Sequence, residues 1–123
     1  MNTYELAVRV NHEVNSSVSY KTDIAQYGKP EHWEPAEEYG DCEDYALLKR
    51  ARLLACGWDR DKLGLVTCVL PTGQGHCVLW VSTQDGDYIL DNRYQEPRNP
   101  ELLDYHWEAM LCNGQWRQLL GWS

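Results

Sequence analysis

Apolar residues near the start of the chain repeat with the period of an α-helix. They recur at intervals of three and four positions, and they are Leu6, Ala7, Val10 and Val14. Thr3 precedes them in the place of an N-cap, and Asn15-Ser16-Ser17 follows them as a polar end. We therefore predict a helix from about residue 4 to residue 15.

The segment from Val18 to Tyr39 shows no such period. Gly28, Pro30 and Pro35 interrupt it, and aromatic residues are scattered through it. We predict an irregular segment, because glycine and proline disfavour the interiors of helices and strands. Its aromatic side chains would pack over another part of the molecule.

The clearest helical pattern in the chain follows Gly40-Asp41. We predict a helix from Cys42 to about Cys56, with Cys42 on its first turn and Gly57 at its C-terminal end. Its apolar residues are Tyr45, Ala46, Leu47, Leu48, Ala51, Leu53 and Leu54.

Short apolar runs in the second half of the chain predict antiparallel strands. We expect three of them, at residues 65–70, 76–82 and 88–91. Asp85-Gly86 predicts a tight turn between the last two, and Asn113-Gly114 predicts a second hairpin within residues 107–120. Because the helices precede the strands, the predicted fold class is α+β, with N-terminal helices packed on a small antiparallel sheet.

The composition is that of one folded domain covering residues 1–123. Hydrophobic residues make up 43% of the chain and charged residues 24%, which leaves enough apolar surface for a core. The 19 acidic residues outnumber the 11 basic ones, and the basic ones are scattered along the chain. We therefore expect neither nucleic acid nor an anionic membrane as a partner.

No segment has the pattern of a membrane span or an export signal. The apolar runs are far shorter than the roughly 20 residues that span a bilayer, and the first five residues lack a basic region followed by an apolar one. We expect a cytoplasmic protein as the sequence stands, and a periplasmic one only if a leader has been removed.

Five widely spaced cysteines, without a CxxC pair, argue against a disulfide framework or a zinc site. We expect reduced thiols, most of which behave as small buried residues. Cys77 would point from its strand into the core. The others expected in the core are Cys56, Cys68 and Cys112.

Cys42, His76 and Asp91 form a candidate nucleophile, base and orienting group. Cys42 lies where the N-terminus of a helix favours a thiolate over a thiol. His76 begins a strand directly after the loop Gly73-Gln74-Gly75, where a substrate could reach it. A cysteine whose histidine partner is held by a carboxylate is the arrangement of cysteine acyl transfer. The competing interpretation is a capped helix packed on a plain hairpin.

The register of the hairpin decides how closely His76 and Asp91 approach. If Asp85-Gly86 forms the turn, Asp91 faces Trp80; if the turn is centred earlier, between Thr83 and Gln84, Asp91 faces His76. Both registers put His76 and Asp91 on one face of the sheet. The shared face is therefore predicted, and the register stays open.

Three long motifs stand out along the chain. They are GDCEDYA at residues 40–46, GHCVL at residues 75–79 and GDYILDN at residues 86–92. Together they resemble the LapG-like family of bacterial transglutaminase-like cysteine proteinases, which includes small stand-alone phage and prophage members. Upstream, the residues that resemble this family are Val10-Asn11, Tyr20, Asp23, Gly28, His32-Trp33 and Pro35.

This resemblance implies a papain-like or transglutaminase-like core and a peptidase mechanism. Cys42 would be the nucleophile, His76 the general base and then acid, and Asp91 the group that orients the imidazole. Attack on a backbone amide would give a thioester that water resolves, with the backbone N–H of Cys42 as an oxyanion donor. The second donor stays open between Trp33 and Tyr39.

Asp41, Glu43 and Asp44 surround Cys42 with carboxylates, and nearby anions raise a thiol pKa. One interpretation is that they cap the helix and complement its dipole. The other is a Ca²⁺ site, because Ca²⁺ binds clustered carboxylate and carbonyl oxygens. The resemblance implies the second, in which bound Ca²⁺ neutralises the carboxylates and lets the thiolate form.

The leading hypothesis is a calcium-supported cysteine peptidase or related amide hydrolase that acts on a protein or peptide. Two alternatives stay open. A transglutaminase or glutamine deamidase would use the same triad, and a non-catalytic calcium-dependent binding or virion-assembly module would keep the triad without turnover. The oligomeric state is left open as well.

Overall fold

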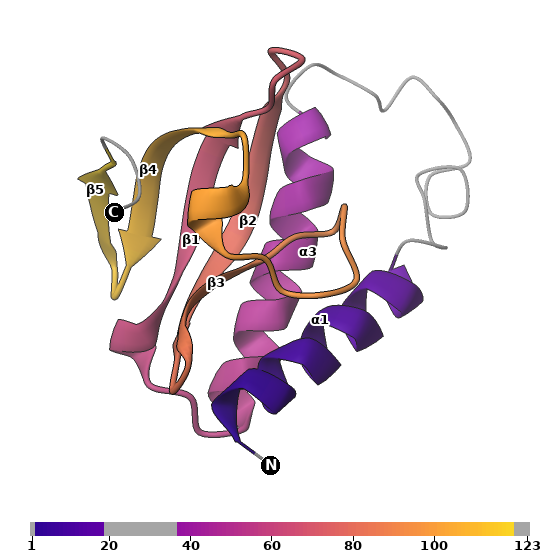
Figure 1. Cartoon of the computed structure of the whole chain (residues 1–123), viewed down its shortest axis with the longest axis vertical. Helices are drawn as coiled ribbons and strands as arrows, with labels where there is room; N and C mark the ends of the chain where they lie inside the picture. The colour runs from indigo at the N-terminus through magenta and orange to yellow at the C-terminus, as the bar shows by residue number, and fades with distance from the viewer. Residues whose placement is uncertain (1, 19–36, 120–123) are drawn as a thin grey trace.

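The computed structural model describes residues 2–18 and 37–119, and for residues 17, 18 and 37–41 it describes the backbone alone. In these ranges two α-helices precede a five-stranded antiparallel sheet, so the α+β prediction is confirmed (Figure 1). The helices are α1 (Thr3–Val18) and α3 (Glu37–Ala55). The strands are β1 (Leu63–Val69), β2 (Gly75–Thr83), β3 (Gly86–Leu90), β4 (His106–Cys112) and β5 (Gln115–Gln118).

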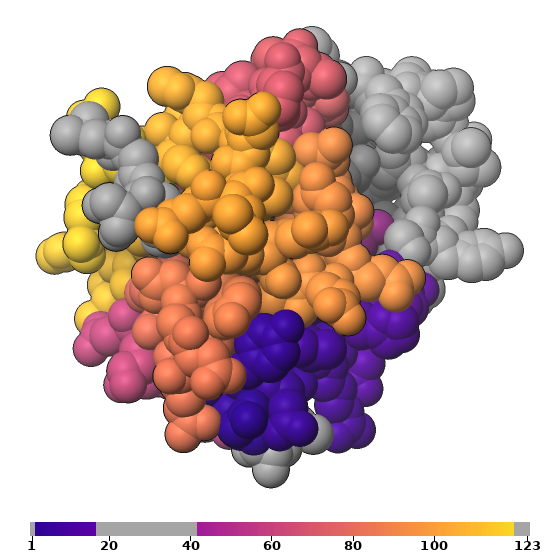
Figure 2. Space-filling view, in the orientation of Figure 1, coloured from indigo at the N-terminus to yellow at the C-terminus, as the bar shows by residue number. Residues whose placement is uncertain are grey.

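The sheet has the strand order β3-β2-β1-β4-β5. Both helices cover one face of it, where α3 packs on β2 and α1 packs on α3 (Figure 1). The segment between β3 and β4, which includes the 3₁₀ helix Pro100–Leu102, covers the other face. Figure 2 shows part of this segment, in orange, against indigo α1. No helix in the described ranges is long and apolar enough to cross a membrane.

Successive residues of β2 alternate between two apolar cores. Cys77 and Leu79 belong to the core beneath the helices, and Val78 belongs to the core on the opposite face. Cys77 therefore points toward the helices, and the ring of His76, directly before it, faces Tyr105. At this end of β2 the candidate base is next in sequence to the residue that faces α3.

α1 begins with a capping box formed by Asn2 and Glu5, so the prediction of Thr3 as the N-cap is wrong. The backbone N–H of Glu5 donates to Oδ1 of Asn2 at 2.8 Å, and the backbone N–H of Asn2 donates to Oε1 of Glu5 at 3.1 Å. Thr3 instead accepts the backbone N–H of Gln84 on its Oγ1 at 2.9 Å. The helix also continues beyond residue 15, because the side chain of Asn15 bonds to another segment and does not compete for its own backbone.

α3 begins at Glu37, five residues before the predicted start at Cys42. Cys42 is therefore the sixth residue of the helix, and the prediction that places it on the first turn is wrong. The acidic pair Glu37 and Glu38 favours the earlier start, because negative charge stabilises a helix N-terminus. Gly40 inside the helix costs only about 1 kcal/mol. Of the predicted irregular segment, residues 37–39 are thus helical, and residues 19–36 lie outside the described residues.

The hairpin between β2 and β3 takes neither of the two predicted registers. Thr83 pairs with Gly86, so the turn consists of Gln84 and Asp85. Gly86 follows the turn with φ of +126°, a backbone conformation that other residues rarely adopt. The register lies midway between the two predicted ones, so the prediction that His76 and Asp91 share a face is confirmed. The second hairpin has the predicted Asn113-Gly114 turn, with positive φ at both residues.

All five cysteines are free thiols. Cys68 and Cys77 are buried, which confirms the core positions predicted for them. Cys56 is exposed, and its predicted core position is wrong, because it follows the last residue of α3 and leaves the face that packs on the sheet. Cys112 is half-buried at the end of β4, and Cys42 is buried.

Candidate active site

The thiol of Cys42 lies against the backbone at the start of β2. The backbone N–H of Cys77 donates to Sγ of Cys42 at 3.1 Å. Cys42 is 4% exposed and belongs to the core that α3 forms with the sheet. Because Cys77 directly follows His76, packing of α3 on β2 brings the thiol beside the residue that carries the candidate base.

Burial raises the pKa of the Cys42 thiol to about 11. The backbone N–H groups of Cys77, Cys42 and Glu43 lower the pKa, and the charge of Asp91 raises it. Burial therefore opposes the thiolate that a position at the start of the helix was predicted to favour, and Cys42 is in the second turn of α3.

His76 and Asp91 form a buried hydrogen-bonded pair. Nε2 of His76 and Oδ1 of Asp91 are 2.8 Å apart, and the residues are 5% and 0% exposed. An ionised carboxylate only accepts hydrogen bonds, so Nε2 carries the proton in this contact. The other ring nitrogen, Nδ1, is then the one that can accept a proton.

Two further donors hold the carboxylate of Asp91. The hydroxyl of Tyr105 donates to Oδ2 at 2.5 Å, and the backbone N–H of Arg93 donates to Oδ1 at 2.9 Å. Burial alone would raise the pKa of Asp91, but the bonds and charge of His76, together with the bonds from Tyr105 and Arg93, lower it below its ordinary value. Asp91 is therefore an ionised carboxylate at neutral pH.

Tyr105, which the sequence does not indicate as a site residue, contacts both members of the pair. Its ring meets the ring of His76 edge-on, with the ring centroids 5.9 Å apart. Burial raises the pKa of Tyr105, and the hydrogen bond to Asp91 raises it further. No local pattern marks Tyr105, because it arrives from the segment that crosses the sheet before β4. The Arg93 contact has a local signal, since an aspartate often accepts the N–H two residues on.

The proposed metal ligands are only partly described. Glu43 and Asp44 are exposed on α3, and the side chain of Asp41 lies outside the described residues. In the part of the chain that the structure describes, no three acidic, histidine or cysteine side chains form a group that could hold a metal ion. The calcium site therefore stays a prediction. Trp33 and the side chain of Tyr39, the two candidates for a second oxyanion donor, also lie outside the described residues.

A buried lysine shares the helix face of Cys42. Lys49 lies two turns further along α3, is 0% exposed, and its Nζ lies 5.9 Å above the ring of Tyr45. Nζ has no hydrogen-bond partner among the described residues. Burial lowers the pKa of Lys49 to about 7, and the charge of Asp91 opposes this shift. Sequence reasoning missed it because lysine on an amphipathic helix is usually solvated.

Replacing Tyr105 with Phe removes a hydrogen bond to the carboxylate of Asp91 and should destabilise the fold. A hydrogen bond to a charged group contributes about 1.5–3 kcal/mol, so we expect Tyr105→Phe to lower the free energy of unfolding at pH 7 by that order. The folded-state pKa of Asp91 is lowered, so this stability is present above pH 3.8 and is lost as pH falls through the lower folded value. Urea denaturation between pH 3 and 7 measures it. Tyr88→Phe is the control, and an equal loss in both variants would contradict the prediction.

Replacing Lys49 with Met should stabilise the fold most at low pH. The folded protein releases the Lys49 proton near pH 7 and the unfolded chain near 10.5, so unfolding takes up a proton between these values. The stability of the wild type should then rise relative to Lys49→Met from pH 7 upward, by at most about 1.4 kcal/mol per pH unit. Urea titrations from pH 6 to 10 test this. The exposed Lys62→Met is the control, and a pH-independent difference would count against the prediction.

Comparison with known proteins places this geometry in a family. The sequence profile of the family described as bacterial transglutaminase-like cysteine proteinase BTLCP matches residues 2–121. Among solved structures, calcium-bound LapG of Legionella pneumophila has a similar fold, with a TM-score of 0.68 and 23% identity over 97% of this chain and 71% of that one. No curated protein sequence matches the chain. Because the profile spans nearly the whole sequence, the chain belongs to the bacterial transglutaminase-like cysteine proteinases and is a cysteine peptidase.

Proposed function

We propose that this peptidase cleaves protein substrates through a triad of Cys42, His76 and Asp91. The observation that carries the proposal is the buried 2.8 Å bond between Nε2 of His76 and Oδ1 of Asp91, beside a thiol held at the same end of β2. A cysteine, a histidine and an orienting carboxylate are the parts that acyl transfer requires.

In the proposed mechanism the resting thiol is neutral, in line with its raised pKa. Nδ1 of His76 takes the thiol proton as Sγ of Cys42 attacks the carbonyl carbon of a peptide bond. The imidazolium then protonates the leaving amine, the C–N bond breaks, and a thioester remains on Cys42. Water attacks the thioester with His76 as base, which releases the carboxylic acid and restores the thiol.

Asp91 acts on the imidazole in two ways. Its acceptor oxygen keeps the proton on Nε2, so that Nδ1 is available as the base, and its negative charge stabilises the imidazolium that forms during the reaction. The backbone N–H of Cys42 was the expected oxyanion donor, but Cys42 is the sixth residue of α3, beyond the four N–H groups that a helix leaves unpaired at its start. We therefore assign no oxyanion donor on α3, and the choice between Trp33 and Tyr39 stays a proposal.

The first test compares the buried thiol of Cys42 with the exposed thiol of Cys56, which directly follows α3. By exposure alone Cys56 should be alkylated faster by iodoacetamide. We expect Cys42 to react faster at pH 7, and His76→Ala to lower its rate by a factor of about 10²–10⁴ without changing Cys56, since a positioned base contributes that much. Mass spectrometry of each cysteine peptide gives both rates. A Cys42 slower than Cys56 would favour the non-catalytic binding module.

The reaction products distinguish peptide hydrolysis from transamidation and from glutamine deamidation. A peptidase leaves a new N-terminus in the substrate, a transglutaminase leaves an isopeptide bond, and a deamidase converts glutamine to glutamate. All three use the same thioester, so Cys42→Ala should abolish each product.

We also propose that Asp41, Glu43 and Asp44 bind Ca²⁺. Support comes from the donor set, since carboxylate oxygens suit Ca²⁺ and two of the three carboxylates are exposed near Cys42, and from the calcium in the similar LapG structure. A bound Ca²⁺ would supply positive charge that favours the thiolate.

Calcium should therefore stabilise the folded protein. At a free concentration 100 times its Kd we expect a gain of about 2.7 kcal/mol, measured by thermal or urea unfolding. Glu43→Gln combined with Asp44→Asn should remove the gain, and the exposed Asp104→Asn should keep it. An equal response to Mg²⁺ and Ca²⁺, or no response to either, would overturn the assignment.

A further inference from the structure

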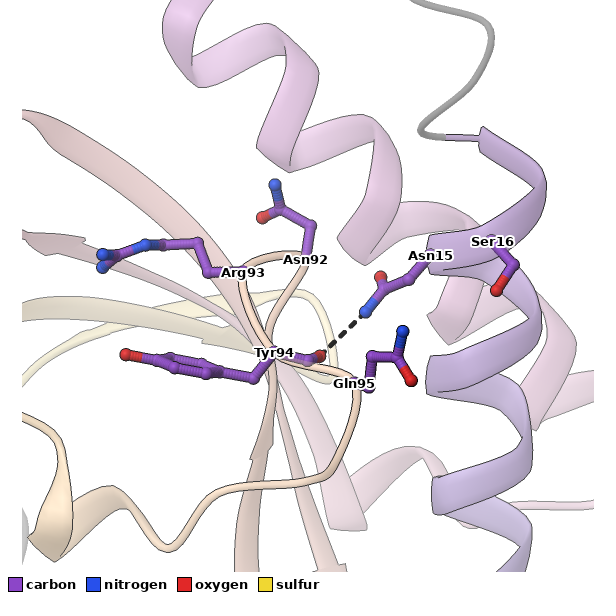
Figure 3. Close-up of a pocket in the computed structure, with 6 residues that line it drawn as sticks. All are labelled: Asn15, Ser16, Asn92, Arg93, Tyr94 and Gln95. Atoms are coloured by element: carbon purple, nitrogen blue, oxygen red, sulfur yellow. Dashed lines mark hydrogen bonds between the residues drawn. The ribbon is translucent and has the colours of Figure 1, made fainter.

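Two asparagines on α1 reach across to the loop that carries Asp91. Nδ2 of Asn15 donates to the backbone carbonyls of Asp91 at 3.1 Å and Tyr94 at 2.9 Å. Nδ2 of Asn11, one helical turn earlier, donates to the carbonyls of Tyr94 at 3.0 Å and Gln95 at 2.8 Å. Figure 3 shows Asn15 extending from α1 to this loop, with the bond to Tyr94 drawn as a dashed line. The two side chains thus bind three backbone carbonyls of one short loop, those of Asp91, Tyr94 and Gln95.

These contacts hold a residue that lies beyond the paired part of the sheet. β3 ends at Leu90, which pairs with Leu79, so Asp91 lies one residue beyond the paired part of the strand. The loop makes its own turn, in which the N–H of Tyr94 donates to the carbonyl of Asp91 at 3.1 Å. An antiparallel bridge between Ile89 and Arg98 closes the base of the loop. Beyond that bridge, the carbonyl of Asp91 is bonded by the turn and by Asn15.

Both side-chain amides are buried, and their N–H groups bond to the loop. Asn11 is 0% exposed and Asn15 is 9% exposed. In each, both hydrogens of Nδ2 are used, whereas Oδ1 has no hydrogen-bond partner among the described residues. A buried polar atom without a partner destabilises a fold, so the unpaired Oδ1 atoms are unfavourable, whereas the four bonds from Nδ2 satisfy loop carbonyls. The contribution that an apolar residue of similar size cannot make is the connection between α1 and the loop.

We propose that Asn11 and Asn15 are positioning residues that hold the carboxylate of Asp91 at bonding distance from His76. This inference rests on the proposed function, in which Asp91 orients the imidazole. The bonds of the two asparagines go to the backbone of the Asp91 loop, so we expect them to act through that backbone. A shift of that backbone moves Oδ1 away from Nε2, and a misplacement of about 1 Å can lower a rate by about 100-fold.

The test substitutes the two amides and reads the His76–Asp91 bond directly. In Asn15→Leu and Asn11→Leu we expect the NMR signal of the His76 Nε2–H to disappear or to exchange with solvent at least about tenfold faster. The alkylation rate of Cys42 at pH 7, relative to Cys56, should fall by about 10–100-fold, with the larger loss for Asn15. Val10→Ala is the control, because it changes a buried residue of α1 whose side chain has no hydrogen-bond donor for the loop carbonyls.

A double-variant comparison separates positioning from a structural role. In the Asp91→Asn background, Asn15→Leu should cause no further loss of Cys42 reactivity, because the group it positions is already altered. A purely structural role predicts the same loss in both backgrounds. If Asn15→Leu does not fold, Asn15→Ala removes the same donors with a good helix former and takes its place.

The inference is overturned if Asn15→Leu loses thermal stability as Val10→Ala does and keeps both the Nε2–H signal and the Cys42 rate. The NMR signal also separates this inference from the proposed function. A wild type whose Cys42 is not activated would defeat the peptidase mechanism, whereas the signal would still report whether the asparagines hold Asp91 on His76.

Discussion

The burial of one negative charge, on Asp91, is the constraint on which the functional end of this molecule depends. An ionised carboxylate out of contact with water is very unfavourable unless hydrogen bonds replace its hydration. Here the replacements come from separate segments: the ring of His76 on β2, the backbone N–H of Arg93, and the hydroxyl of Tyr105 before β4. The hydrogen bond that helps to compensate the buried charge of Asp91 thus also fixes the orientation of the His76 imidazole.

A second consequence of this charge concerns the thiol. Asp91 and burial both disfavour the thiolate of Cys42, while three backbone N–H groups favour it. The raised pKa favours the neutral thiol, from which the proposed mechanism starts. A cation near the start of α3 would shift the balance toward the thiolate, which is the role proposed for Ca²⁺.

The sequence predicts the parts of the fold that local chemistry determines. The period-two alternation of β2 and β3 is enough to place His76 and Asp91 on one face, even though the register is neither of the two that the turn residues indicated. Asn113-Gly114 specifies its turn because few residues accept positive φ twice in succession. The start of α3 is missed because Gly40 was read as a boundary, whereas Glu37 and Glu38 extend the helix past it. Tyr105 and Lys49 could not be predicted, since the role of each arises from packing between distant segments.

The dispersal of the site along the chain has a consequence for the order in which it is made. During synthesis the N-terminal residues emerge first, so Asn11 and Cys42 are present long before Tyr105 closes the hydrogen bonds around Asp91. Until the segment with Tyr105 has been made, the nascent chain carries a thiol and an imidazole but an incompletely bonded carboxylate. A site assembled in this way is complete only after four separate segments, from α1 to the residues before β4, have been made and have folded together.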